Sequence, residues 1–117
     1  MIAIVVKSIH DDPQPNDGFR VLVDRNMPKG MNETSAKVDL WLGGIAPSPR
    51  LHKWYRNDPA QWDEFLARYF AELDESSLLV TELFQKMTGE RVTLLYVAQD
   101  AALNTAVALK HYLEGDE

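Results

Sequence analysis

Short apolar runs that do not alternate with polar residues limit what this chain can fold into. Residues 2–6 read IAIVV, residues 19–24 read FRVLVD and residues 92–98 read VTLLYVA. Continuous apolar runs of this length are typical of strands buried on both faces of a parallel sheet. We therefore predict three strands at these positions. Residues 38–42 form either a further strand or an irregular connection.

Amphipathic helices are predicted between and after these strands. Ser48 and Pro49 have the pattern of an N-cap and first helical residue, and this helix must end before Pro59. Asp58 caps the next helix, whose apolar residues follow at spacings of three and four: Trp62, Phe65, Leu66, Tyr69, Phe70 and Leu73. The first helix should turn Leu51, Trp54 and Tyr55 inward.

A third helix is expected over residues 77–87 with Leu79, Leu83, Phe84 and Met87 inward, and a last one from a cap at Asp100 to about residue 114. Strands interleaved with helices predict a single α/β domain with a small, mostly parallel sheet flanked by helices.

Composition narrows the class of protein. A chain of 117 residues fits one domain with one core. It has no cysteine, which excludes disulfides, thiolate catalysis and zinc–thiolate sites. No apolar run approaches the ~20 residues that a membrane helix needs, so we expect a soluble, cytoplasmic protein with no membrane contact. So small a sheet is also compatible with a homo-oligomer.

Charged residues follow two of the predicted strands at their carboxyl ends. Asp24 and Arg25 end one strand and lead into the turn around Lys29, and Tyr96 to Asp100 connect another strand to the last helix. Ligands of parallel sheets bind beyond the carboxyl strand ends, and the free amides of a helix start attract anions. We therefore predict a site for a small phosphate or carboxylate ligand. The residues predicted to bind it are Arg25, Lys29, Asp39, Tyr96, Gln99 and Asn104.

The same residues admit other interpretations. Asp24 and Arg25 can simply end a strand, and Asp100 can simply cap a helix. Asp24, Asp39 and Asp100 can also converge for acid–base chemistry or to hold a divalent cation, and Asp24 and Asp100 are the catalytic candidates. The three histidines lack metal-ligand spacing, so no metal site is predicted. The sequence identifies neither a reaction nor a cofactor.

The charge distribution bears on partners. The net charge of −6 comes from residues 71–117, with three Lys/Arg and nine Asp/Glu, whereas residues 1–70 carry nine of each. This balance disfavours general nucleic-acid binding, which needs clustered cations. A local basic patch remains, and its candidates are Arg20, Arg25, Lys29, Arg50, His52, Lys53 and Arg56. The alternative function is therefore a non-catalytic module that binds a protein or nucleic acid through this patch.

An ordered set of motifs resembles a known family. The chain contains RVLVDR, PKG, DLWL, APS, LxKW, DPxxWxEF, YxAEL, TLLYxAxD and NxAVxL in that order. This set is similar to the YeaO-like family of uncharacterised bacterial proteins over about residues 1–114. The resemblance implies a compact α/β domain in a cytoplasmic bacterial protein, and it implies no activity.

The chain also departs from the family pattern at four positions. The family reads RxWPRG where this chain has Met27 and Lys29, and AKDxxHN where this chain has Gln99 and Leu103. A cation and an imidazole are thus absent near the second strand end. If the family catalyses a reaction with that lysine or histidine, the resemblance implies that this member is altered or inactive. Lys29 retains the charge of the arginine it replaces but not its bidentate fork.

Overall fold

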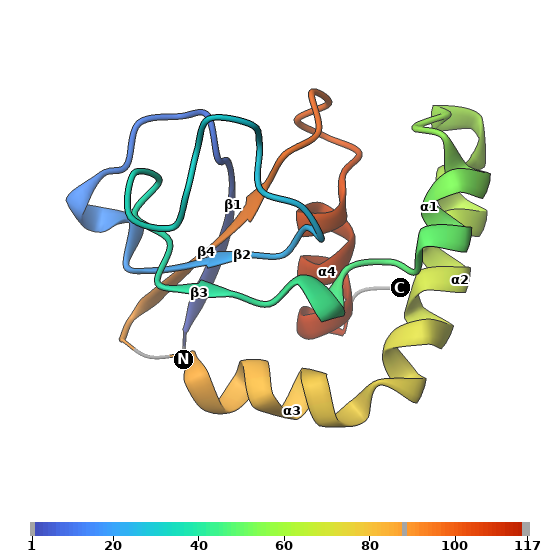
Figure 1. The fold of residues 1–117 in the computed structure, drawn as a ribbon. Helices are drawn as coiled ribbons and strands as arrows, with labels where there is room; N and C mark the ends of the chain where they lie inside the picture. The colour runs from blue at the N-terminus through green and yellow to red at the C-terminus, as the bar shows by residue number, and fades with distance from the viewer. Residues whose placement is uncertain (1, 88, 116–117) are drawn as a thin grey trace.

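Four parallel strands form the sheet at the centre of the fold, here described from a computed structural model over residues 2–87 and 89–115 (Figure 1). The strands are β1 (Ala3–Ser8), β2 (Phe19–Leu22), β3 (Leu40–Trp41) and β4 (Arg91–Tyr96). Their spatial order is β1-β4-β2-β3, so the last strand of the chain lies between the first two. Every pairing is parallel, which confirms the predicted fold class.

Four α-helices and three short 3₁₀ turns make up the rest of the regular structure described. The helices are α1 (Pro49–Tyr55), α2 (Trp62–Glu75), α3 (Ser77–Lys86) and α4 (Thr105–Glu114), and the turns are η1 (Pro15–Asp17), η2 (Gly43–Ile45) and η3 (Pro59–Gln61). The Ser48 hydroxyl accepts a hydrogen bond from the amide of Leu51 at 3.1 Å and caps α1, as its sequence predicts. No helix within the described residues is long and apolar enough to cross a membrane.

The two faces of the sheet are covered differently. The helices cover one face and pack against the side chains of Val21, Val92 and Leu94, which are fully buried. On the other face Leu22 and Leu95 pack against residues of the loops that follow β1 and β2. Those loop residues are Ile9, Ala36 and Val38, with Met27 and Met31 partly buried beside them. The sheet is therefore flanked by helices on one face and by loops on the other (Figure 1).

Asp58 was expected to cap α2, but its carboxylate accepts from the Ala60 amide at 3.0 Å and caps the turn η3, so that α2 begins at Trp62. Two expectations about burial also differ from the structure. The strand at the start of the chain was expected to be buried on both faces, but β1 is an edge strand, and most of its residues are half-buried. Phe84 was expected to face inward on α3 and is 50% exposed, whereas Leu83 beside it is fully buried. Both differences arise because burial depends on which element lies opposite, and a single segment does not contain that information.

A buried ion pair joins three of the strands at the amino ends of β2 and β4. The Asp17 carboxylate accepts hydrogen bonds from Arg20 Nη1 at 2.5 Å and from Lys7 Nζ at 3.1 Å. The carbonyl oxygen of Asp17 accepts a third hydrogen bond, from the Thr93 hydroxyl at 2.6 Å. Lys7 lies on β1, Arg20 on β2 and Thr93 on β4, so Asp17 connects all three.

Arg20 also holds the long loop that returns to β3. Its guanidinium is almost fully buried and donates to the carbonyl oxygens of Ala36 at 2.8 Å and Lys37 at 2.9 Å. The Arg20 amide donates to the Asp39 carboxylate at 2.9 Å. This loop, residues 23–39, connects two parallel strands without a helix, and its end is thus fixed on β2.

Gly18 allows the close approach on which the Asp17 contacts depend. Its φ is +70°, a conformation that side chains rarely adopt. A Cβ atom there would lie 2.2 Å from the carbonyl oxygen of Arg91. Glycine therefore lets η1 lie directly against the start of β4.

We expect Asp17→Asn to lower the free energy of unfolding by about 3 kcal/mol or more at pH 7, since it leaves the buried Arg20 guanidinium without its counterion. Burial raises the pKa of Asp17, but the hydrogen bonds from Gln14, Lys7 and Arg20 outweigh burial and bring that pKa below its usual value of 3.8. The ionised form therefore stabilises the fold above the unfolded-state pKa, and this stabilisation is lost as the pH falls through the folded-state pKa. Urea denaturation should therefore show that the free energy of unfolding of Asp17→Asn falls less far below that of the wild type at pH 3 than at pH 7. The exposed Asp11→Asn is the matched control, and an equal loss at both pH values would contradict this account.

Candidate functional site

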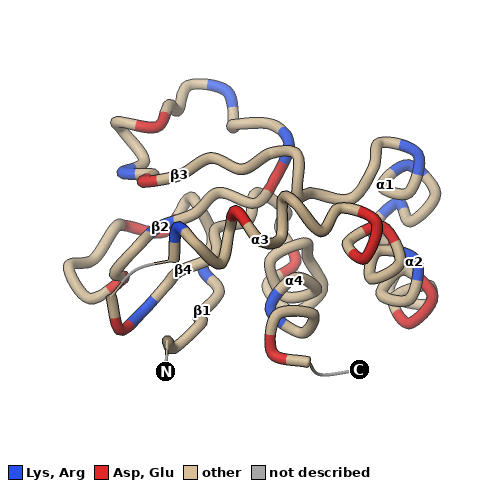
Figure 2. Tube along the Cα trace, turned by 90° about the horizontal axis from the view of Figure 1, so that it is seen from below, with Lys and Arg blue, Asp and Glu red and all other residues tan. Residues whose placement is uncertain are grey.

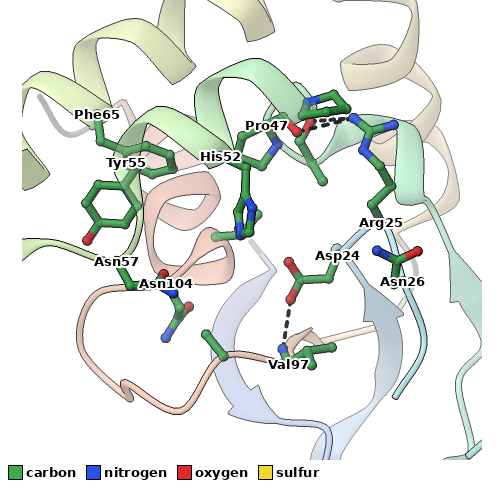
Figure 3. A pocket seen from close by; sticks show the side chains of 14 residues that line it. Asp24, Arg25, Asn26, Pro47, His52, Tyr55, Asn57, Phe65, Val97 and Asn104 are labelled. Atoms are coloured by element: carbon green, nitrogen blue, oxygen red, sulfur yellow. Dashed lines mark hydrogen bonds between the residues drawn. The ribbon is translucent and has the colours of Figure 1, made fainter. Parts of the chain in front are cut away.

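The carboxyl ends of β2 and β4 lie side by side, because the two strands pair in parallel as far as Leu22 and Leu95. The amide of Val23 donates to the carbonyl oxygen of Leu95 at 3.2 Å and extends the contact by one residue. A cavity of about 370 Å³ lies beyond these ends (Figure 3). Its polar lining comes from Asp24, Arg25, Asn26, His52, Asn57, Asn104 and Thr105, and its apolar lining includes Pro47, Pro49 and Phe65.

Asp24 places a partly buried carboxylate in this cavity. Its Oδ2 atom accepts a hydrogen bond from the amide of Val97 at 2.7 Å. Burial raises the pKa of Asp24 and outweighs the effects of the Val97 amide, the nearby Thr105 side chain and His52, all of which favour the ionised form. The carboxylate thus joins the end of β2 to the segment that follows β4 and contributes a group whose ionised form is disfavoured.

Helix α1 brings His52 to the opposite side of the cavity. Ser48, the cap of α1, is held in turn by Glu72 of α2, whose carboxylate accepts from the Ser48 amide at 2.8 Å and from its hydroxyl at 2.6 Å. This contact fixes the position of α1 over the strand ends. The imidazole of His52 and the carboxylate of Asp24 point toward one another across the cavity (Figure 3).

An aromatic stack closes one wall. The rings of Tyr55 and Phe65 stack with centroids 4.3 Å apart, and Phe65 stacks in turn with Trp62 at 5.5 Å and Tyr69 at 5.8 Å. Tyr55 is 3% exposed and lines the cavity with Phe65. These rings serve as core packing, as their helical spacing predicts.

Arg25 lies at the other end of the cavity. Its Nη2 atom donates to the carbonyl oxygens of Pro47 at 3.2 Å and Ala46 at 3.5 Å, the second a long contact. The residue is exposed, and the remaining N–H groups of its guanidinium make no hydrogen bond within residues 2–87 and 89–115. Arg25 can therefore receive an acidic group while the two carbonyls hold its orientation.

The start of α4 differs from the prediction. Asp100 was expected to cap this helix, but Asn104 does so by accepting a hydrogen bond from the Val107 amide at 2.9 Å. Asp100 instead accepts from the amides of Ala102 at 2.8 Å and Leu103 at 3.1 Å. Asp100 therefore closes a turn in the loop before the helix. An aspartate side chain accepts from amides two and three residues ahead both in turns and at helix caps, so the sequence alone does not separate the two roles.

Three of the predicted site residues line the same cavity and five do not. Asp24, Arg25 and Asn104 come together in it. Lys29, Gln99 and Asp100 are exposed and outside its lining, and Tyr96 is buried in the core below it. Asp39 precedes β3 and so lies at the amino ends of the strands, which corrects the expectation that it converges with Asp24 and Asp100.

Five lining residues with polar side chains were not among the predicted ligand contacts: Asn26, His52, Tyr55, Asn57 and Thr105. The sequence places His52 and Tyr55 on a helix one turn apart, but it does not say that this helix lies over the strand ends. That placement comes from Glu72, 24 residues after Ser48. Thr105 could have been found as the first residue of the last helix had Asn104 been recognised as its cap.

The described residues contain no group of three or more His, Asp or Glu side chains that could hold a metal ion. A separate groove is lined by Arg50 and Lys53 of α1 and by Arg56, the residue that ends this helix. Its aromatic residue, Trp54, is covered by the Arg68 guanidinium at 4.3 Å from the ring centroid. The acidic residues of α2 lie nearby (Figure 2). A stacking platform for bases is therefore not open there.

Comparison with known proteins gives relatives without established functions. An uncharacterised protein of Mycobacterium tuberculosis is 37% identical over 111 residues, covering 94% of this chain and 92% of the relative. An uncharacterised protein of Mycobacterium bovis matches with the same identity and coverage. The uncharacterised protein YeaO of Escherichia coli is 32% identical over 110 residues, covering 94% and 96%. No solved structure matches.

One family model covers almost the whole chain. It matches residues 3–116 and is described as the inactive DUF488-N3 subclade. The relatives include YeaO itself, which confirms the resemblance inferred from the ordered motifs. The curated relatives of this chain are uncharacterised bacterial proteins, and the chain belongs to the family described as the inactive DUF488-N3 subclade.

Proposed function

We propose that this chain binds a small molecule in the cavity at the carboxyl ends of β2 and β4, with an acidic group of the ligand at Arg25. One observation carries the proposal: two neighbouring strand ends bring Asp24, Arg25 and the start of α4 to the same cavity. Its volume of about 370 Å³ lies within the range typical of ligand sites. Polar groups on apolar walls are also the usual composition of such sites.

The function that these residues support best is binding without turnover. The family description calls the subclade inactive, and we extend this word to the present chain. Of the two acid–base candidates, Asp100 is committed to its loop and lies outside the cavity lining. Asp24 already accepts a hydrogen bond from the Val97 amide. Gln99 and Leu103 replace the two titratable groups expected from the family pattern, which leaves Asp24 and His52 for acid–base catalysis in this cavity.

Benzoate is a suitable probe, since it carries one carboxylate on a flat apolar body. Titration calorimetry at low salt should detect binding to the wild-type protein, and Arg25→Gln should weaken it roughly tenfold by removing charge-assisted hydrogen bonds. The matched control is Arg91→Gln, an exposed arginine at the amino end of β4. Equal affinities of the wild type and Arg25→Gln, or no binding of benzoate or inorganic phosphate at millimolar concentration, would refute the proposal. Lys29→Gln tests separately whether Lys29 reaches the ligand.

Asp24 supplies an independent prediction, because its burial costs stability when it is ionised. Its folded-state pKa is raised above the unfolded value, so its favourable contribution is fully present below the unfolded pKa and is lost as the pH rises through the folded pKa. Asp24→Asn keeps an oxygen for the Val97 amide and removes the charge. We expect this variant to unfold at a higher urea concentration than the wild type at pH 7, with the difference shrinking at pH 3.

The same variant should also bind benzoate more tightly. Benzoate has no hydrogen-bond donor for the Asp24 carboxylate, so removing that charge removes a repulsion within the cavity. The calorimetric comparison uses the conditions chosen for Arg25→Gln. Unchanged or weaker binding of benzoate by Asp24→Asn would contradict the placement of the acidic group in this cavity.

A further inference from the structure

The hydroxyl of Tyr55 is a buried polar group without a partner. Tyr55 is 3% exposed, and its hydroxyl oxygen makes no hydrogen bond within residues 2–87 and 89–115. The other tyrosines of the helical layer are satisfied: Tyr69 donates to the carbonyl oxygen of Ile45 at 2.7 Å and Tyr112 to Asp74 at 2.6 Å. Nearly all buried polar groups in proteins are hydrogen-bonded, and an unpaired one typically costs about 1–3 kcal/mol.

The packing of the ring does not require this hydroxyl. The ring of Tyr55 stacks on Phe65 with centroids 4.3 Å apart and lies tilted against Trp62 at 5.9 Å. A phenylalanine would make the same ring contacts without the cost of an unpaired oxygen. The hydroxyl therefore needs an explanation outside the core, and the cavity that Tyr55 lines supplies one.

The hydroxyl points toward the end of the cavity where Asn57 and Asn104 lie, away from Arg25 (Figure 3). Asn104 already uses its oxygen to cap α4 and its amide group to bind the carbonyl oxygen of Asp100 at 2.9 Å. Asn57 follows the end of α1 and has an exposed side chain. Solvent does not reach the Tyr55 hydroxyl in this conformation, so a side chain beside it must move before any ligand can contact it.

Charge around Tyr55 determines which group fits there. Burial raises the pKa of the Tyr55 hydroxyl, and the negative charges of Asp100 and Asp58 raise it further. The hydroxyl thus remains protonated at neutral pH, and the same carboxylates repel an anionic group at this end of the cavity. A neutral tyrosine hydroxyl both donates and accepts, which suits an amide or carbonyl group.

We propose that the Tyr55 hydroxyl is the second recognition point of the cavity and hydrogen-bonds an uncharged amide or carbonyl group of a ligand whose acidic group lies at Arg25. The inference rests on the proposed function and adds the chemical class of the ligand: a small molecule with an acidic group at one end and an uncharged polar group at the other. Arg25 and Tyr55 come from the end of β2 and the end of α1, so the ligand bridges the sheet and the helical layer.

The test compares benzoate with meta- and para-carbamoylbenzoate, which carry an added amide group at two different distances from the carboxylate. At least one of the two amides should bind the wild-type protein roughly three- to tenfold more tightly than benzoate, the gain expected for one hydrogen bond. Tyr55→Phe should abolish this gain, so that neither amide binds the variant more tightly than benzoate does. Arg25→Gln should weaken all three probes.

Urea denaturation without ligand separates this role from a structural one. Tyr55→Phe should unfold at the same or a higher urea concentration than the wild type, since it removes an unpaired hydroxyl. Tyr69→Phe, which breaks the hydrogen bond to Ile45, is the matched control and should unfold at a lower concentration.

The outcomes distinguish the two proposals. If benzoate does not bind, or binds without Arg25, the proposed function fails and this inference fails with it. If benzoate binds through Arg25 but neither amide adds affinity, or the gain survives in Tyr55→Phe, only the role of Tyr55 is overturned. A loss of stability in Tyr55→Phe equal to that in Tyr69→Phe would likewise overturn it.

Discussion

The buried pair of Asp17 and Arg20 is the interaction on which the arrangement of this fold depends. Asp17 contacts β1 through Lys7 and β4 through Thr93, and Arg20 adds β2 and the loop that returns to β3. β4 comes last in the sequence yet lies between β1 and β2. The central pairings therefore join strands that are far apart in the sequence. Contacts at the amino ends of β2 and β4 help to set the register of these two strands, and this register aligns their carboxyl ends. That register places Asp24 beside Val97.

The carboxylates at the two ends of β2 thus have pKa values that are shifted in opposite directions. At the amino end, hydrogen bonds from two cations and an amide hold the pKa of Asp17 below its usual value. At the carboxyl end, burial raises the pKa of Asp24 and outweighs the hydrogen bond from the Val97 amide. One carboxylate stabilises the fold when ionised, and the other costs stability in the same state. A costly charge in a cavity is a feature common at ligand sites.

Local sequence signals predicted the elements well and the contacts between elements poorly. The strands, the Ser48 cap and the buried face of α2 depend on residues a few positions apart, and these predictions are confirmed. The parallel pairing of β2 and β4 also followed, since alternating strands and helices favour it. The inward Phe84 was wrong, and Asp39 does not converge with Asp24 and Asp100; both outcomes depend on neighbours distant in the sequence. The capping role of Asp100 was wrong for a local reason, because Asn104, four residues later, caps α4 instead. His52 and Tyr55 were missed as site residues for the same reason: a contact between Glu72 and Ser48 places α1 over the strand ends.

The departures from the family pattern fall where they leave the cavity intact. Gln99 and Leu103 lie in the loop between β4 and α4, and neither lines the cavity. This loop is held by Asp100, which binds the amides of Ala102 and Leu103, and by Asn104, which binds the carbonyl oxygen of Asp100. None of these hydrogen bonds uses the side chain at position 99 or 103. The side chains at positions 99 and 103 therefore take no part in holding the start of α4, which keeps its place beside the cavity whichever residues stand at those positions.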